Sequence, residues 1–139
     1  MRKINLVITF ITILIISSCS SNEENIGNET LSIVGTWQLV EATSSDNPNN
    51  TLNNCQLQSK ITFKIDKTGE LDNYAFDTVI NDCILSESDF SYEINELKLI
   101  INENNFINES DYELSEAFLT QSFNNSQGNR RTNKWKRVN

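Results

Sequence analysis

Hydrophobic and polar residues alternate in short segments from Val34 onward, with almost no stretch spaced like an amphipathic helix. In the segment 59–66, for example, Ile61, Phe63 and Ile65 fall in phase and separate polar residues. This period of two is typical of strands with one buried face. The expected strands are 35–42, 59–66, 70–80, 89–94, 97–102, 106–115, 117–123 and 130–138.

Short turn sequences separate several of these segments. Asp66–Glu70 predicts a turn in which Gly69 is free to take a positive φ, and Asn95-Glu96 and Asn104-Asn105 predict two-residue turns. Short turns join antiparallel neighbours, so sequence order should equal sheet order. We therefore expect an all-β, eight-stranded antiparallel up-and-down barrel. An open sandwich is the alternative that periodicity does not exclude.

The alternation also predicts which side chains face the barrel interior. Many of the expected inward residues are large, and few are polar, which favours a mostly filled barrel with a shallow apolar mouth. The expected inward positions are Trp37, Leu39, Ile61, Phe63, Ile65, Tyr74, Phe76, Phe90, Tyr92, Ile94, Leu97, Leu99, Ile101, Tyr112, Leu114, Leu119, Phe123 and Trp135.

The beginning of the chain has a different pattern. Arg2 and Lys3 precede a run, 4–16, that is apolar except for three polar residues. The run is shorter than the roughly 20 residues that a membrane-spanning helix needs, and small residues follow it, so it predicts a secretory signal. No later run is apolar enough to span a bilayer.

Ile16-Ser17-Ser18-Cys19 resembles the bacterial lipobox. The resemblance implies cleavage before Cys19 and acylation of that cysteine, with palmitate among the acyl groups, where a plain signal peptide is the alternative. We expect a lipoprotein signal peptide at 1–18, a lipidated tether at 19–32 and a barrel domain at 33–139. The predicted location is the bacterial cell envelope, as an outer-membrane lipoprotein.

The tether lacks hydrophobic periodicity and carries the acidic pair Glu23-Glu24. This pair resembles the export signal of surface lipoproteins in Bacteroidetes, which implies surface exposure. A merely solvated linker is the alternative.

Without residues 1–18, the chain keeps nine of its 11 basic residues and all 19 acidic ones. This excess of negative charge disfavours nucleic acid as a partner. Basic residues are concentrated in the last segment, 130–138, where we expect them to neutralise neighbouring acidic strands.

Three cysteines leave one unpaired if two form a disulfide, and lipidation of Cys19 accounts for the odd one. Cys55 and Cys83 then remain, and cysteines outside the cytoplasm tend to pair. We therefore predict a Cys55–Cys83 disulfide.

The sequence contains no histidine, which excludes Ser–His and Cys–His catalytic pairs and histidine-containing metal sites. The acidic stretch Asn108–Glu113 suits loose cation binding, but a solvated strand face is the preferred interpretation. We predict no enzymatic activity, no metal and no cofactor; a hydrolase that uses carboxylates alone is the weakest alternative.

Several motifs in order carry a resemblance to a known family. They are Gly35-Thr36-Trp37, Cys55, Ile61-Thr62-Phe63, Thr68-Gly69-Glu70, Cys83 and Leu97 to Ile101. Together they resemble the small lipocalin-like domains of Bacteroidetes lipoproteins over residues 33–138, although Phe90 stands where a tryptophan would be expected.

The resemblance implies binding of a small hydrophobic ligand, and we expect a monomer. The expected lining residues are Trp37, Tyr74, Phe90, Tyr92 and Tyr112. Trp37 has a second, preferred interpretation, because in lipocalins this tryptophan closes one barrel end beneath a basic side chain, here Arg137.

The alternative function is a surface adaptor or inhibitor with a filled barrel that holds a protein or polysaccharide partner. Asp77-Thr78-Val79 also resembles an acceptor for O-linked glycans, although the alternation suggests that Thr78 points inward.

Overall fold

The computed structural model describes residues 31–138. The predicted signal peptide, Cys19 and the pair Glu23-Glu24 lie outside these residues. The strands are β1 (Gly35–Ser44), β2 (Lys60–Phe63), β3 (Thr68–Asp77), β4 (Asp82–Asn95), β5 (Lys98–Glu103), β6 (Phe106–Leu114), β7 (Phe118–Asn124) and β8 (Arg130–Val138), with a short 3₁₀ helix, η1 (Gln56–Gln58).

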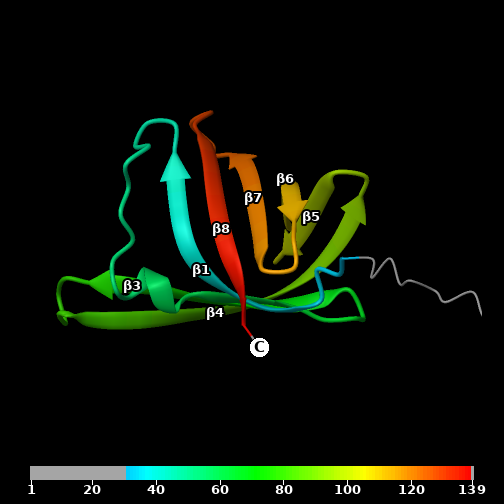
Figure 1. Cartoon of the computed structure of the whole chain (residues 1–139). Coiled ribbons are helices and arrows are strands. Elements are labelled where there is room, and N and C mark those ends of the chain that lie inside the picture. The colour runs from blue at the N-terminus through cyan, green and yellow to red at the C-terminus, as the bar shows by residue number, and fades with distance from the viewer. Residues whose placement is uncertain (1–30, 139) are drawn as a thin grey trace, which may run out of the picture.

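The strands form one closed antiparallel barrel in sequence order (Figure 1). The barrel closes because β1 pairs with β8 as well as with β2; Leu39 lies opposite Trp135, and a register shift follows between Leu39 and Glu41. The up-and-down barrel is therefore confirmed, and the open-sandwich alternative is excluded. Among residues 31–138, no helix is long and apolar enough to cross a membrane.

The turns agree with the sequence in one case and shift in another. Asn104 and Asn105 both take positive φ, at 50° and 66°, as a tight hairpin turn requires. The turn between β4 and β5 is displaced by one residue from the prediction, because Asn95 still pairs with Lys98 and the turn is Glu96-Leu97.

The prediction for Gly69 is wrong. The residue with positive φ in this turn is Lys67, at 67°, whereas Gly69 lies within β3 and is buried. Glycine is required there for space, because a Cβ atom would collide with the Phe90 ring and the backbone oxygen of Thr62.

The hydrophobic core is built from residues of β1, β2, β4, β5, β7 and β8, together with Ile33. Its largest fully buried members are Trp37, Tyr92, Phe63, Leu99 and Leu119. The complete cluster is Ile33, Trp37, Leu39, Ile61, Phe63, Phe90, Tyr92, Leu99, Leu119 and Trp135.

The side chains of β3 alternate between the inner and outer faces of the barrel, but the set predicted to face inward faces outward. Buried Ile61 lies opposite Leu71, so Leu71 faces the interior, and Tyr74 and Phe76 lie on the outer face. Phe76 is 46% exposed. The expectation that Tyr74 and Phe76 point inward is therefore wrong.

Ile65 and Leu97 are further corrections to the expected interior. β2 ends at Phe63, so Ile65 lies in the following turn and is 87% exposed. Ile94 lies directly opposite buried Leu99 and so keeps the predicted inner face, although it is 38% exposed at the end of β4. Leu97, by contrast, occupies the shifted turn and is 76% exposed. Strand periodicity fails here because it continues into residues that the turns remove from the sheet.

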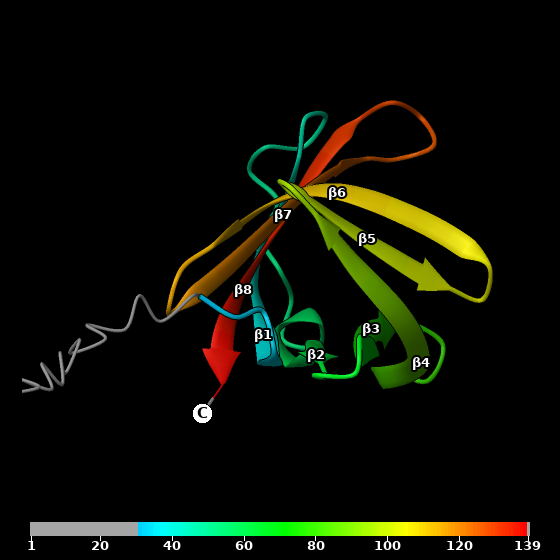
Figure 2. The same ribbon diagram turned by 90° about the vertical axis from the view of Figure 1, so that its right-hand side faces the viewer.

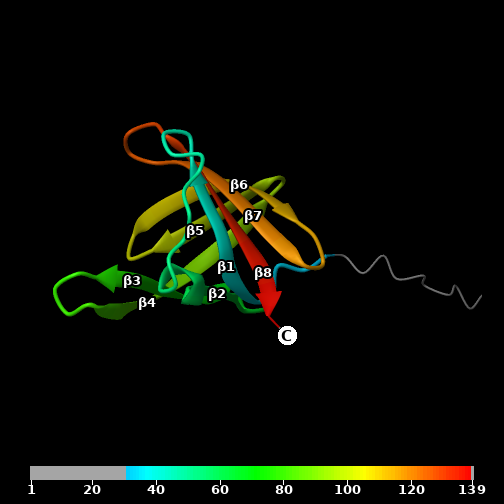
Figure 3. The same cartoon turned by 60° about the vertical axis from the view of Figure 1, so that its left-hand side comes forward.

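The β3–β4 hairpin is much longer than its neighbours and extends beyond them (Figures 1 and 3). The β5–β6 hairpin extends in a different direction (Figure 2). The barrel consequently has a closed end, where Leu31–Val34 leads into β1, and a wider end formed by the long hairpins and the β1–β2 loop.

Candidate functional site

The closed end of the barrel is organised around Trp37. Its indole Nε1 donates a hydrogen bond to the backbone oxygen of Ile33 at 2.8 Å, and the Arg137 guanidinium lies 4.1 Å from the ring centroid. Arg137 also donates to the backbone oxygens of Ser32, Val34 and Glu116. The predicted pairing of Trp37 and Arg137 is confirmed, and this fully buried indole is a structural plug, inaccessible to a ligand in this conformation.

Above the plug lies a layer of aromatic rings. Phe63 contacts Phe90 and Tyr92 edge to face, with ring centroids 5.4 and 5.0 Å apart. The Tyr92 hydroxyl donates to the backbone oxygen of Lys64 at 2.8 Å, and burial raises the pKa of this phenol. Phe90 and Tyr92, both predicted to line a site, form a filled floor with no spare polar group for a ligand.

Five apolar side chains pack against this core and remain partly exposed: Leu52, Leu71, Ile101, Tyr112 and Leu114. Leu71 lies opposite Ser88 and Ile101 lies opposite Tyr92, so both are on the inner face where β3, β4 and β5 meet. We call the surface of Leu71, Phe90, Tyr92 and Ile101 the apolar floor. It is the candidate binding surface inside the barrel.

The five predicted lining residues thus lie in four different places. Phe90 and Tyr92 lie together in the floor, Tyr112 packs against the core from β6, and Trp37 is sealed beneath them. Tyr74 is on the outer face, away from the others. Sequence reasoning missed Leu71, which only the register of β2 with β3 identifies as an inward residue.

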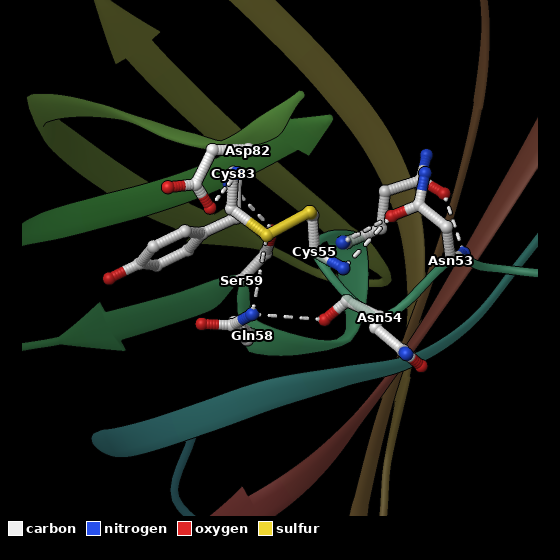
Figure 4. The surroundings of a disulfide bond; sticks show 9 residues. Asn53, Asn54, Cys55, Gln58, Ser59, Asp82 and Cys83 are labelled. Carbon is white, nitrogen blue, oxygen red and sulfur yellow. Dashed lines mark hydrogen bonds between the residues drawn. A yellow bond between two sulfur atoms is a disulfide. The ribbon is translucent and has the colours of Figure 1, made fainter. Parts of the chain in front are cut away.

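Cys55 and Cys83 form a disulfide, as predicted, and are 28 positions apart in the sequence (Figure 4). The bond fastens the β1–β2 loop to the start of β4. Nearby, Ser59 accepts a hydrogen bond from the backbone N–H of Tyr74 at 2.9 Å and is itself buried. The two links hold the loop against the long hairpin.

The acidic stretch of β6 is neutralised by basic side chains. Asp111 contacts Lys98 at 2.8 Å and Arg130 at 3.0 Å, and Lys98 also reaches Glu109 at 3.3 Å. The hydrogen bond from Lys98, with that from Arg130, lowers the pKa of Asp111. Within residues 31–138, no group of three or more His, Cys, Asp or Glu side chains could hold a metal ion.

Thr78 lies in the β3–β4 turn and is exposed, so the expectation that it points inward is wrong. Asp77 accepts hydrogen bonds from the backbone N–H groups of Val79 and Ile80 and shapes the turn. Glycosylation at Thr78 stays a prediction. The exposed position of Thr78 makes its side chain accessible for this modification.

Comparison with known proteins finds two similar solved structures and one matching family model. Two solved structures are similar: a de novo designed fluorescence-activating β-barrel (12% identity, 76% of this chain and 93% of that chain, TM-score 0.45) and a redesigned β-barrel (17% identity, 76% and 91%, TM-score 0.48). No curated protein matches the sequence. The family model of the lipocalin-like domain matches residues 33–125, so the chain belongs to the lipocalin-like domain family.

Proposed function

We propose that the barrel binds one small hydrophobic molecule on the apolar floor. The observation that carries this proposal is the partial exposure of Leu71 and Ile101, which pack on the core without being covered by it. Covering such apolar surface is worth about 25 cal/mol for each Å² removed from water. Membership of the lipocalin-like family supports the same function.

The filled core limits the ligand to a shallow position. Phe63, Phe90 and Tyr92 occupy the interior beneath the floor, and Trp37 closes the end. A ligand that stays above these rings is held mainly by apolar contacts, because the Tyr92 hydroxyl is already bonded to Lys64. The proposal therefore favours a compact apolar molecule over a long chain that would thread the barrel.

Replacing Ile101 with lysine is expected to weaken binding of the neutral probe phenylnaphthylamine by about tenfold, because a charge beside the floor opposes apolar burial. The matched control is Leu97→Lys, which makes the same change at a residue that is 76% exposed in the β4–β5 turn. Fluorescence titration of the chain from Ser20 onward measures both, and melting curves verify folding. Equal probe affinities for the two folded variants would refute the floor as the site.

We further infer that Cys19 anchors the barrel, as a monomer, to the outer membrane after removal of residues 1–18. The lipobox resemblance supports this, and so does the way the described chain enters the barrel: Leu31–Val34 lies at the closed end, beneath Arg137. A lipid on Cys19 would thus hold the closed end nearer the membrane and leave the wider end accessible. The pair Glu23-Glu24 supports export to the cell surface.

Cys19→Ala is expected to move the protein from the membrane fraction to the soluble fraction of the envelope and to abolish labelling with palmitate. Anchoring by more than one acyl chain is stable, so the wild-type protein should stay in the membrane fraction after washing. Ser20→Ala serves as the control for the neighbouring position. Unchanged membrane association of Cys19→Ala would show that another element anchors the chain.

A further inference from the structure

The long strand β4 has one edge that no other strand of residues 31–138 covers. β3 pairs with β4 from Asp82 to Ser91, whereas β5 pairs with it only from Ser91 to Asn95. The segment from Asp82 to Phe90 is therefore paired on one side alone. This uncovered edge belongs to the hairpin that extends beyond the barrel (Figures 1 and 3).

The hydrogen-bond pattern shows which backbone groups this edge presents. The N–H of Tyr92 donates to the oxygen of Lys67 at 2.8 Å, on the β3 side. Alternate residues of a strand point their N–H and C=O groups to the same side, so Leu85, Glu87 and Asp89 present theirs on the uncovered side. These three are exposed, and their side chains lie on the outer face.

The same face is strongly acidic. Glu70 lies directly opposite Asp89, and Asp72 lies directly opposite Glu87. Like charges in directly opposed positions destabilise a sheet. Lys64 forms an ion pair with Glu70, and Lys60 of β2 lies directly opposite Asp72, whereas Glu87 and Asp89 have neither an ion pair within residues 31–138 nor a basic residue directly opposite them in β3. The local structure therefore leaves two carboxylates, Glu87 and Asp89, that a basic partner would stabilise.

The outer surface beside this edge is hollowed. A groove of about 560 Å³ is lined by Glu70, Asp72, Glu87, Ser88, Asp89 and Asn104. A second groove, of about 400 Å³, shares Asp89 with it and continues past Ser91 and Asn102. The two grooves together follow the outer side of β4 toward the end of β5.

We propose that the uncovered edge of β4 binds an extended basic segment of a partner protein, which adds to the sheet as a further strand. Backbone hydrogen bonds to Glu87 and Asp89 would supply affinity, and lysine or arginine at alternate positions of the partner would face the carboxylates. At the alternate position of the partner strand that faces Leu85, an apolar side chain fits, because Leu85 is 43% exposed. This surface is distinct from the apolar floor, so the proposal goes beyond ligand binding.

Charge also selects among the occupants of this edge. A second copy of the chain, paired through the same edge, would bring Glu87 and Asp89 of one copy close to those of the other. Such like-charge contacts disfavour association and are one way in which proteins protect edge strands. The carboxylates thus disfavour self-association and favour a basic strand.

The experiment uses the full chain solubilised in a non-ionic detergent and three blocked peptides. One alternates lysine and threonine, the second has glutamate in place of lysine, and the third is the lysine peptide with every lysine backbone nitrogen methylated. Methylation keeps the charge but removes the donors that strand addition requires. We expect the first peptide to bind at least about tenfold more tightly than either of the others.

Two further readouts locate the site. The lysine peptide should slow hydrogen exchange at the backbone amides of Glu87 and Asp89, and the double variant Glu87→Lys, Asp89→Lys should lower its affinity about tenfold. The matched control is Glu113→Lys, Glu116→Lys, which changes two exposed carboxylates, one near the end of β6 and one in the turn after it, and should leave the affinity unchanged.

Equal binding of the methylated peptide, or an equal loss in the control variant, would overturn strand addition in favour of general charge attraction. Failure of the lysine peptide to bind the wild-type protein at millimolar concentration would overturn the proposal outright. So would a dimer that forms through β4. None of these outcomes bears on binding at the apolar floor, because the phenylnaphthylamine titration tests that function separately.

Discussion

Replacing Trp37 with alanine is expected to lower the free energy of unfolding by about 3–5 kcal/mol. The substitution empties a fully buried position, removes the hydrogen bond to Ile33 and takes away the ring beneath Arg137. For a domain of this size, the loss corresponds to a fall in Tm of more than about 10 °C. Urea and thermal unfolding of the chain from Ser20 onward measure the effect.

Trp135 provides a matched control, because it is also buried but its Nε1 is the one buried side-chain nitrogen or oxygen without a hydrogen-bond partner in residues 31–138. Trp37→Phe should lower the free energy of unfolding by about 1–2 kcal/mol, because the hydrogen bond is lost and the cation–π contact is weakened. The free energy of unfolding of Trp135→Phe should stay within about 1 kcal/mol of the wild-type value. The gain from removing a donor without a partner offsets the loss from the small cavity that phenylalanine leaves. Equal losses in both variants would contradict the role assigned to Trp37.

Replacing both Cys55 and Cys83 with serine is expected to destabilise the barrel by about 3.5 kcal/mol, on the chain-entropy estimate for a loop of 28 residues. The bond holds the β1–β2 loop against β4, so its loss gives the unfolded chain more freedom and releases the loop. Urea unfolding of the oxidised protein and of the double variant measures the difference.

Reduction of the wild-type disulfide supplies the control for this prediction. The reduced protein and the double serine variant should unfold at similar urea concentrations, both well below the oxidised protein. If reduction left the midpoint unchanged, the β1–β2 loop would be held by its other contacts, such as the hydrogen bond of Gln38 to the oxygen of Leu57.

The sequence predicted the strands better than their orientation. In β1 and β2 the larger apolar residues face the core, and the alternation identifies Trp37 and Ile61 correctly. In β3 the larger side chains, Tyr74 and Phe76, are outside, because this part of the hairpin extends beyond the barrel and burial no longer selects the inner face. Only pairing with β2 fixes the orientation.

The binding surfaces were less predictable than the fold. The alternation placed Phe90, Tyr92 and Ile101 inside, but the sequence does not indicate how far the rings fill the interior. The acidic edge is visible only after Glu70 is placed opposite Asp89 and Asp72 opposite Glu87, which requires the register of β3 with β4. Gly69 likewise has a packing role that a turn pattern conceals.

Native mass spectrometry of the protein purified from its own host tests the central claim, that the lipocalin-like barrel binds a small hydrophobic molecule. We expect a population with one small apolar molecule bound, which Ile101→Lys reduces and Leu97→Lys leaves in place. A wild-type protein that carries no such molecule, and binds no phenylnaphthylamine when the probe is added, would contradict it.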